Sequence, residues 1–117
     1  TAAERPDAVG AVIAQSSSLW QESVVDRVAA AMPVTTRGVL EVGRQEWVLT
    51  GPHRELSRRL RERGALLVHR EFDGGHDYAC WRGGLLDAVA ETLAAGSAST
   101  SASSSASVSW ATRSRSA

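Results

Sequence analysis

The chain has 117 residues, enough for one domain at most, and equal numbers of acidic and basic side chains, 13 of each. The neutral balance gives no overall field toward nucleic acid. No run of residues is long and apolar enough to span a bilayer, so we expect no membrane partner. Cys80 is the single cysteine, which excludes an intrachain disulfide and favours a reducing compartment such as the cytoplasm.

The elements expected along the chain alternate between strands and helices. A continuous apolar run over residues 9–14 is typical of a strand buried on both faces, as in a parallel sheet. Apolar side chains then recur at helical spacing until Pro33, and Pro52 suits the first turn of a second helix. The expected order is a strand at 9–14, a helix at 22–31, a strand at 38–42, a helix at 52–64, a strand at 66–72 and a helix from Trp81 to Gly96.

Alternation with short connections predicts an α/β fold, in which three parallel strands are joined by right-handed crossovers. Function in such sheets resides in the loops after the carboxyl ends of the strands. These loops are residues 15–20, 43–50 and 73–81. The Ser/Ala-rich residues from Gly96 onward cannot bury enough surface to become ordered. We therefore expect a folded portion over residues 1–95 and a flexible, disordered tail over residues 96–117.

His76 is the first candidate for chemistry. It follows a strand on a Gly74-Gly75 turn, which lets the backbone present the imidazole. A neutral imidazole is the usual general base for a hydroxyl nucleophile. Spacing alone favours the alternative, a loop histidine hydrogen-bonded for structure only. His53 and His69 lack this turn chemistry, and we expect both to be structural.

Glu46 is the candidate acid partner of His76. It lies in the loop after the preceding strand, where its carboxylate can fix the tautomer of the base and stabilise the imidazolium. Acid and base after successive late strands is the chain order of α/β-hydrolases. The alternative is an ordinary exposed glutamate. No Gly-x-Ser-x-Gly elbow is present, Ser16, Ser17 and Ser18 lack its flanking glycines, and no residues have the spacing of a metal site.

Three segments together resemble the enterochelin (enterobactin) esterase family. The longest and most specific is FDGGHDYACWRGGL, at residues 72–85. The segment VIAQSSSLW, at residues 12–20, and VGRQE, at residues 42–46, resemble two further segments of that family in the same order. The resemblance covers about residues 5–93.

The resemblance implies the C-terminal part of an α/β-hydrolase catalytic domain over residues 1–95, with His76 as catalytic base. It implies Glu46 as the acid, although some relatives work with a Ser–His dyad, and it places the nucleophilic serine before Thr1. It further implies a serine esterase without a cofactor that hydrolyses a catecholate siderophore, usually as the ferric complex, and releases iron inside the cell.

The resemblance also implies a set of substrate-binding residues. Trp20, Trp81 and Arg82 are suitable walls, because indoles stack on catechol rings and a guanidinium favours an anionic complex. Ser16 belongs to the segment that floors the pocket. The alternative for the wall residues is packing around the pocket.

The chain departs from the family pattern at Ala14, Ser17 and Gln21, which stand where the family has a serine, a glycine and often an aromatic residue. The reaction class is therefore better supported than the substrate. Two alternatives follow: a general carboxylesterase of the same fold, and a truncated, non-catalytic fragment that lacks the nucleophile.

Overall fold

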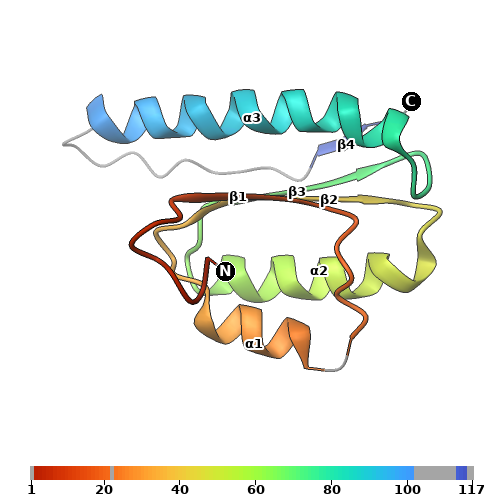
Figure 1. The fold of residues 1–117 in the computed structure, drawn as a ribbon, viewed down its shortest axis with the longest axis horizontal. Helices are drawn as coiled ribbons and strands as arrows, with labels where there is room; N and C mark the ends of the chain where they lie inside the picture. Colours follow the sequence, from red (N-terminus) through yellow and green to blue (C-terminus); the bar gives the residue numbers. More distant parts are fainter. Residues whose placement is uncertain (1, 22, 102–112, 116–117) are drawn as a thin grey trace.

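The computed structural model describes residues 2–21, 23–101 and 113–115, which form one parallel sheet with helices on both faces (Figure 1). The strands lie in the order β1-β2-β3-β4. Helices α1 and α2 cover one face and α3 covers the other. The expected three parallel strands alternating with helices are confirmed. The elements are β1 (Ala11–Gln15), α1 (Val24–Ala31), β2 (Arg37–Gly43), α2 (Trp47–Glu62), β3 (Leu67–Phe72), α3 (Tyr78–Ser101) and β4 (Arg113–Arg115).

Each face of the sheet has an apolar core of its own. Successive side chains of a strand point to opposite faces, so neighbouring residues of β2 enter different cores. Leu40 packs with Leu56 and Leu60 of α2, whereas Val39 packs with Ala88 of α3. Coverage on both faces explains why the apolar residues of β1 and of the centre of β2 follow one another without alternating with polar ones.

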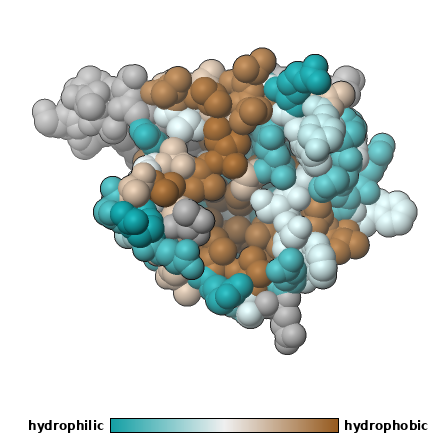
Figure 2. Space-filling model, in the orientation of Figure 1, coloured by the Kyte–Doolittle hydropathy of each residue, from teal (hydrophilic) through white to brown (hydrophobic). Residues whose placement is uncertain are grey.

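Apolar surface also remains uncovered in the part of the chain that the structure describes. A cavity of ≈ 340 Å³ with a mainly apolar lining lies between the sheet and helices α1 and α2. Figure 2 shows apolar side chains gathered across this face and around a hollow. Apolar surface left uncovered in this way is a candidate contact for further protein or for a ligand. Helix α3 also exposes the aliphatic side chains of Leu85, Leu86, Val89 and Leu93.

Two helices begin earlier than the sequence pattern predicts. Helix α2 begins at Trp47, so Pro52 lies inside the helix and not in its first turn, and α3 begins at Tyr78 and not at Trp81. A proline inside a helix removes one backbone hydrogen bond. Burial of the apolar face of α2, which includes Leu49 and Leu56, outweighs this loss, because tertiary packing supplies most helix stability in proteins.

The C-terminal residues differ from the expectation in two places. Helix α3 continues past Gly96 to Ser101, and Arg113–Arg115 pairs with β3 as a fourth strand. A glycine costs a helix only about 1 kcal/mol relative to alanine, so Gly96 among alanines does not end α3. The remainder of the expected flexible tail, residues 102–112 and 116–117, lies outside the described residues. Within the described part of the chain, no helix has both the length and the hydrophobicity needed to cross a bilayer.

Candidate active site

The loops after β2 and β3 meet because parallel strands end at the same edge of the sheet. Two backbone hydrogen bonds join them: Arg44 N donates to Phe72 O at 2.9 Å, and Gln45 N donates to Gly74 O at 3.1 Å. A Cβ atom on Gly43 would overlap the Gly74 carbonyl oxygen. Glycine at position 43 therefore permits the close approach that brings the two loops together.

His76 and Glu46 form a hydrogen-bonded pair across these loops. Nδ1 of His76 lies 2.7 Å from Oε1 of Glu46. The His76 side chain is 62% exposed, whereas that of Glu46 is only 5% exposed. Contact at Nδ1 favours the tautomer with its proton on that nitrogen and directs the basic lone pair to Nε2. No residue in the described part of the chain hydrogen-bonds Nε2, so this nitrogen can accept a proton from a substrate or nucleophile.

Glu46 accepts hydrogen bonds from three donors. Besides His76, they are the Ser16 hydroxyl, 2.6 Å from Oε2, and the Gly43 backbone N–H, 2.7 Å from the same oxygen. Burial raises the pKa of Glu46, but the hydrogen bonds from Ser16, Gly43 and His76 together lower it below its usual value. The carboxylate is therefore ionised at neutral pH and can stabilise an imidazolium on His76.

Two further side chains contact this pair: Ser16 contacts Glu46, and Trp81 contacts His76. The Trp81 ring packs edge-on against His76, with ring centroids 4.5 Å apart, and its Nε1–H donates to Ser16 Oγ at 3.0 Å. Ser16 itself is 5% exposed. Both residues are expected to contact substrate, and the structure places them in contact with Glu46 and His76. The Tyr78 ring also packs edge-on against Trp81, with ring centroids 5.3 Å apart.

An open depression of ≈ 510 Å³ lies beside His76 and Glu46. Two tryptophans contribute to its lining, Trp20 at 58% exposed and Trp47 at 85% exposed. Trp20 was expected here, whereas sequence reasoning missed Trp47, whose only signal was an aromatic residue directly after the candidate acid. Arg82 is exposed on α3 and does not line the depression. The remaining lining residues are Gln45, Val48 and Leu49.

The other two histidines are buried. Nδ1 of His53 bonds the Leu49 carbonyl at 2.8 Å, and His69 is 5% exposed within β3. Burial lowers the pKa of His53, and it lowers that of His69 to about 4. These positions fit the structural roles expected for both. Among the described residues, no three His, Cys, Asp or Glu side chains are arranged to hold a metal ion.

The strand–helix order, with Glu46 and His76 after successive parallel strands, is that of part of an α/β-hydrolase domain. Two crystal structures of the enterobactin esterase of Shigella flexneri have this fold. The one determined in the presence of enterobactin matches with a TM-score of 0.68 and covers 74% of this chain and 25% of that one. The one with 2,3-di-hydroxy-N-benzoyl-glycine has a TM-score of 0.67, and both are 29% identical in sequence to this chain.

Sequence comparison gives the same relatives. The chain is 33% identical over 96 residues to the iron(III) enterobactin esterase of Escherichia coli (strain K12), and 31% identical to that of strain CFT073. Each match covers 74% of this chain and 24% of the relative, so the chain spans about a quarter of the length of these proteins. No family model matches the sequence. The resemblance to the enterochelin esterases that the sequence predicts is confirmed.

Proposed function

We propose that this chain supplies the base His76 and the acid Glu46 of a serine esterase that hydrolyses a catecholate siderophore of the enterobactin type. The observation that carries the proposal is the 2.7 Å contact between these side chains at the edge of the sheet. It occurs in a chain similar to iron(III) enterobactin esterases and to an esterase crystallised in the presence of enterobactin.

The nucleophilic serine of this esterase comes from a segment outside residues 1–117. No Gly-x-Ser-x-Gly elbow occurs in the sequence, and the serine hydroxyl beside the acid, that of Ser16, is buried and donates to Glu46. The uncovered apolar cavity and the exposed apolar side chains of α3 give further parts of such a domain surfaces to pack against. In this proposal residues 1–95 belong to the catalytic domain.

The reaction then uses the two faces of His76. The serine attacks the ester carbonyl while Nε2 takes its proton, and Glu46 stabilises the imidazolium at Nδ1. Backbone N–H groups hold the oxyanion. The imidazolium protonates the leaving seryl oxygen and then, as a neutral base, activates water to release the acyl group.

The depression beside His76 accommodates the substrate in this proposal. Exposed indoles at Trp20 and Trp47 offer flat apolar faces on which catechol rings stack. Arg82 is a more distant contact for the anionic ferric complex. Hydrolysis of such a ligand releases its iron. In this proposal the release takes place inside the cell, and the enzyme is therefore cytoplasmic.

His76→Ala in the complete enzyme tests the proposal. We expect kcat for ferric enterobactin to fall at least about 1,000-fold, because the base is lost. Arg58→Gln, at an exposed and ion-paired position of α2, is the control and should stay within two-fold. A loss of only a few-fold in His76→Ala would contradict the assignment of the base.

Two further assays separate the alternatives. Faster turnover of simple aryl esters than of ferric enterobactin by the complete enzyme would favour a general carboxylesterase. The 117-residue chain by itself should show no turnover of an activated ester. Turnover that a serine-directed inhibitor abolishes would show that the chain contains its own nucleophile, contrary to the proposal.

A further inference from the structure

We propose that Ser16 is a positioning residue. Together with Gln15 it fixes the carboxylate of the acid Glu46 and the ring of Trp81, which lies beside the base His76. The inference rests on the proposed esterase function of the His76–Glu46 pair. It assigns a role to the end of β1, the strand that contributes neither the acid nor the base.

The Ser16 hydroxyl has one proton and two partners of opposite kind. An ionised carboxylate such as Glu46 can only accept, and the indole N–H of Trp81 can only donate. The hydroxyl therefore donates to Glu46 Oε2, at 2.6 Å, and accepts from Trp81 Nε1, at 3.0 Å. Because its proton is committed to Glu46 and its side chain is buried, Ser16 does not contact substrate.

The backbone of Ser16 is adapted to this role. Its φ is 50°, in the left-handed region that few residues other than glycine adopt. Its N–H donates to the Glu41 carbonyl at 2.8 Å, so pairing with β2 continues through the turn. A non-glycine residue keeps such a conformation only where its surroundings determine it. Here the conformation brings the hydroxyl to Glu46.

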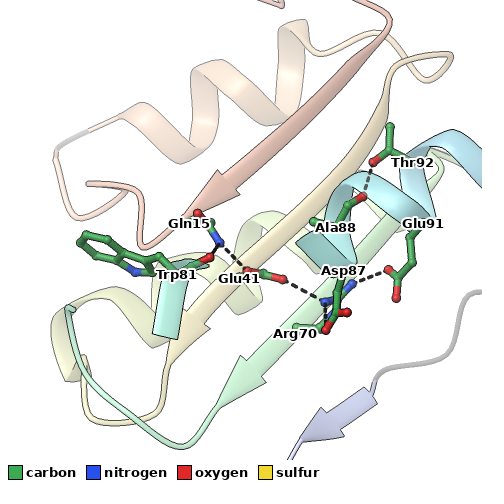
Figure 3. Close-up of polar contacts among 8 residues, drawn as sticks. All are labelled: Gln15, Glu41, Arg70, Trp81, Asp87, Ala88, Glu91 and Thr92. Atoms are coloured by element: carbon green, nitrogen blue, oxygen red, sulfur yellow. Dashed lines mark hydrogen bonds and ion pairs between the residues drawn. The ribbon is translucent and has the colours of Figure 1, made fainter. Parts of the chain in front are cut away.

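Gln15, the preceding residue, contacts the backbone carbonyl of Trp81. Its Nε2 donates to the Trp81 carbonyl at 2.7 Å and to Glu41 Oε2 at 2.9 Å (Figure 3). Glu41 in turn accepts from Arg70 at 3.0 Å. Two consecutive residues thus fix the carbonyl and the indole N–H of Trp81, whose ring lies against His76.

A loss of this contact should lower the rate and leave substrate binding unchanged. Without the Ser16 hydroxyl, Oε2 of Glu46 keeps only the Gly43 N–H, and the carboxylate is free to turn away from His76. We expect kcat of the complete esterase to fall about 10- to 100-fold with KM within two-fold, the effect of one hydrogen bond to a charged group.

Two substitutions separate the hydroxyl from the backbone. Ser16→Ala and Ser16→Gly both remove the hydroxyl, but only glycine suits the positive φ. Equal losses of kcat in both would support the proposal, whereas a wild-type rate in Ser16→Gly would overturn it. Arg58→Gln, at an exposed and ion-paired position of α2 outside the site, is the control and should stay within two-fold.

A double variant tests whether Ser16 acts through Glu46. In a Glu46→Gln background, Ser16→Gly should lower kcat no more than two-fold further, since the group that it positions has lost its charge. A full multiplicative loss would overturn the inference. If His76→Ala and Glu46→Gln both kept wild-type rates, the proposed esterase function would fail, and this inference with it.

A measurement without turnover tests the contact itself. In a ¹H–¹⁵N spectrum of the same protein, Ser16→Gly should shift the indole N–H signal of Trp81, assigned by its loss in Trp81→Phe. The indole signals of Trp20 and Trp47 should keep their positions. An unchanged Trp81 signal would overturn the role of Ser16 even where His76→Ala abolishes hydrolysis.

Discussion

Glu41 and Glu46 are both buried and both paired, yet they differ in the chemistry they can support. The Glu41 side chain lies within β2 and is 2% exposed, and the Glu46 side chain follows that strand and is 5% exposed. Each accepts a hydrogen bond from one of two consecutive residues, Gln15 for Glu41 and Ser16 for Glu46. The two carboxylates thus have similar burial and similar support from the neighbouring strand.

The two carboxylates differ in the basic side chain with which each one pairs. Glu41 pairs with Arg70, whose side chain is 7% exposed, and Glu46 pairs with His76, whose side chain is 62% exposed. A guanidinium cannot act as a general base, whereas a neutral imidazole can accept a proton and give it back. The pair inside the sheet can therefore only stabilise the fold. The pair at the end of the strands can take up and return a proton, and it reaches solvent.

Glu46→Gln should give the largest effect on activity. Glutamine retains the shape and can still accept from Ser16 and Gly43, but it cannot stabilise an imidazolium. We expect kcat of the complete esterase to fall about 10³- to 10⁴-fold. The free energy of unfolding should change by only about 1 kcal/mol, because His76 remains in solvent. A kcat within five-fold of wild type would show a Ser–His dyad in which Glu46 is dispensable.

Arg70→Met should give the largest effect on stability. It leaves the Glu41 carboxylate buried without its cation, and breaking a buried pair in this way costs about 3–5 kcal/mol. The loss is measured as the free energy of unfolding in urea. Arg70→Met combined with Glu41→Gln removes both charges and should recover part of it. A single-variant loss below about 1 kcal/mol would show that water or Gln15 compensates Glu41 adequately.

The strands, their parallel order and the contact between Glu46 and His76 could be predicted from the sequence. Apolar runs and turn residues are local signals, and they predict the strands. The order of Glu46 and His76 along the chain predicts that these two side chains meet. The Glu41–Arg70 pair could not be predicted in this way. The two residues are 29 positions apart and meet because Glu41 is in register with Arg70 across β2 and β3. Sequence periodicity predicts a strand but not its register.

The contacts of Ser16 and the start of α2 could not be predicted from the sequence for a related reason. The segment around Ser16 suggests a place in the substrate pocket, whereas its hydrogen-bond partners Glu46 and Trp81 come from distant loops. Pro52 suggested a helix start, and tertiary packing extended α2 back to Trp47. That extension also places the exposed Trp47 in the lining of the depression that His76 borders. In each case, contacts between distant segments outweighed the local preference.

The lowered pKa of His69 should make the free energy of unfolding depend on pH, independently of the two carboxylate pairs. Burial lowers its pKa from 6.5 to about 4. The imidazole is neutral in both states above pH 6.5, and as the pH falls toward 4 the unfolded chain takes up a proton that the folded chain does not. Stability should therefore fall by about 3 kcal/mol across this window. His69→Leu should remove the part of the slope that comes from His69 in unfolding free energies measured between pH 7 and pH 4, and the buried His53, whose pKa is also lowered, should keep the remainder.

Glu46→Gln is the matched comparison for this pH profile. The pKa of Glu46 is lowered, so its stabilising contribution is complete above its usual pKa of 4.5 and is lost only as the pH falls below that value. The variant should keep the slope between pH 6.5 and 5. If His69→Leu keeps the whole slope as well, another group is the source of the acid sensitivity.

Gly84→Ala tests how firmly the inner carboxylate is held. A Cβ atom on Gly84 of α3 would overlap the Glu41 carboxylate, whereas one on the adjacent Gly83 would meet no atom within 4 Å. Alanine in an open helical position stabilises by about 1 kcal/mol relative to glycine, and we expect this gain for Gly83→Ala. At Gly84 overpacking should reverse the sign and cost about 1–3 kcal/mol, since Gln15 and Arg70 hold Glu41 from two sides. Thermal unfolding of both variants measures the difference. Stabilisation by both would show that the Glu41 carboxylate can move, and the contrast with the exposed pair at Glu46 would then be one of burial and not of rigidity.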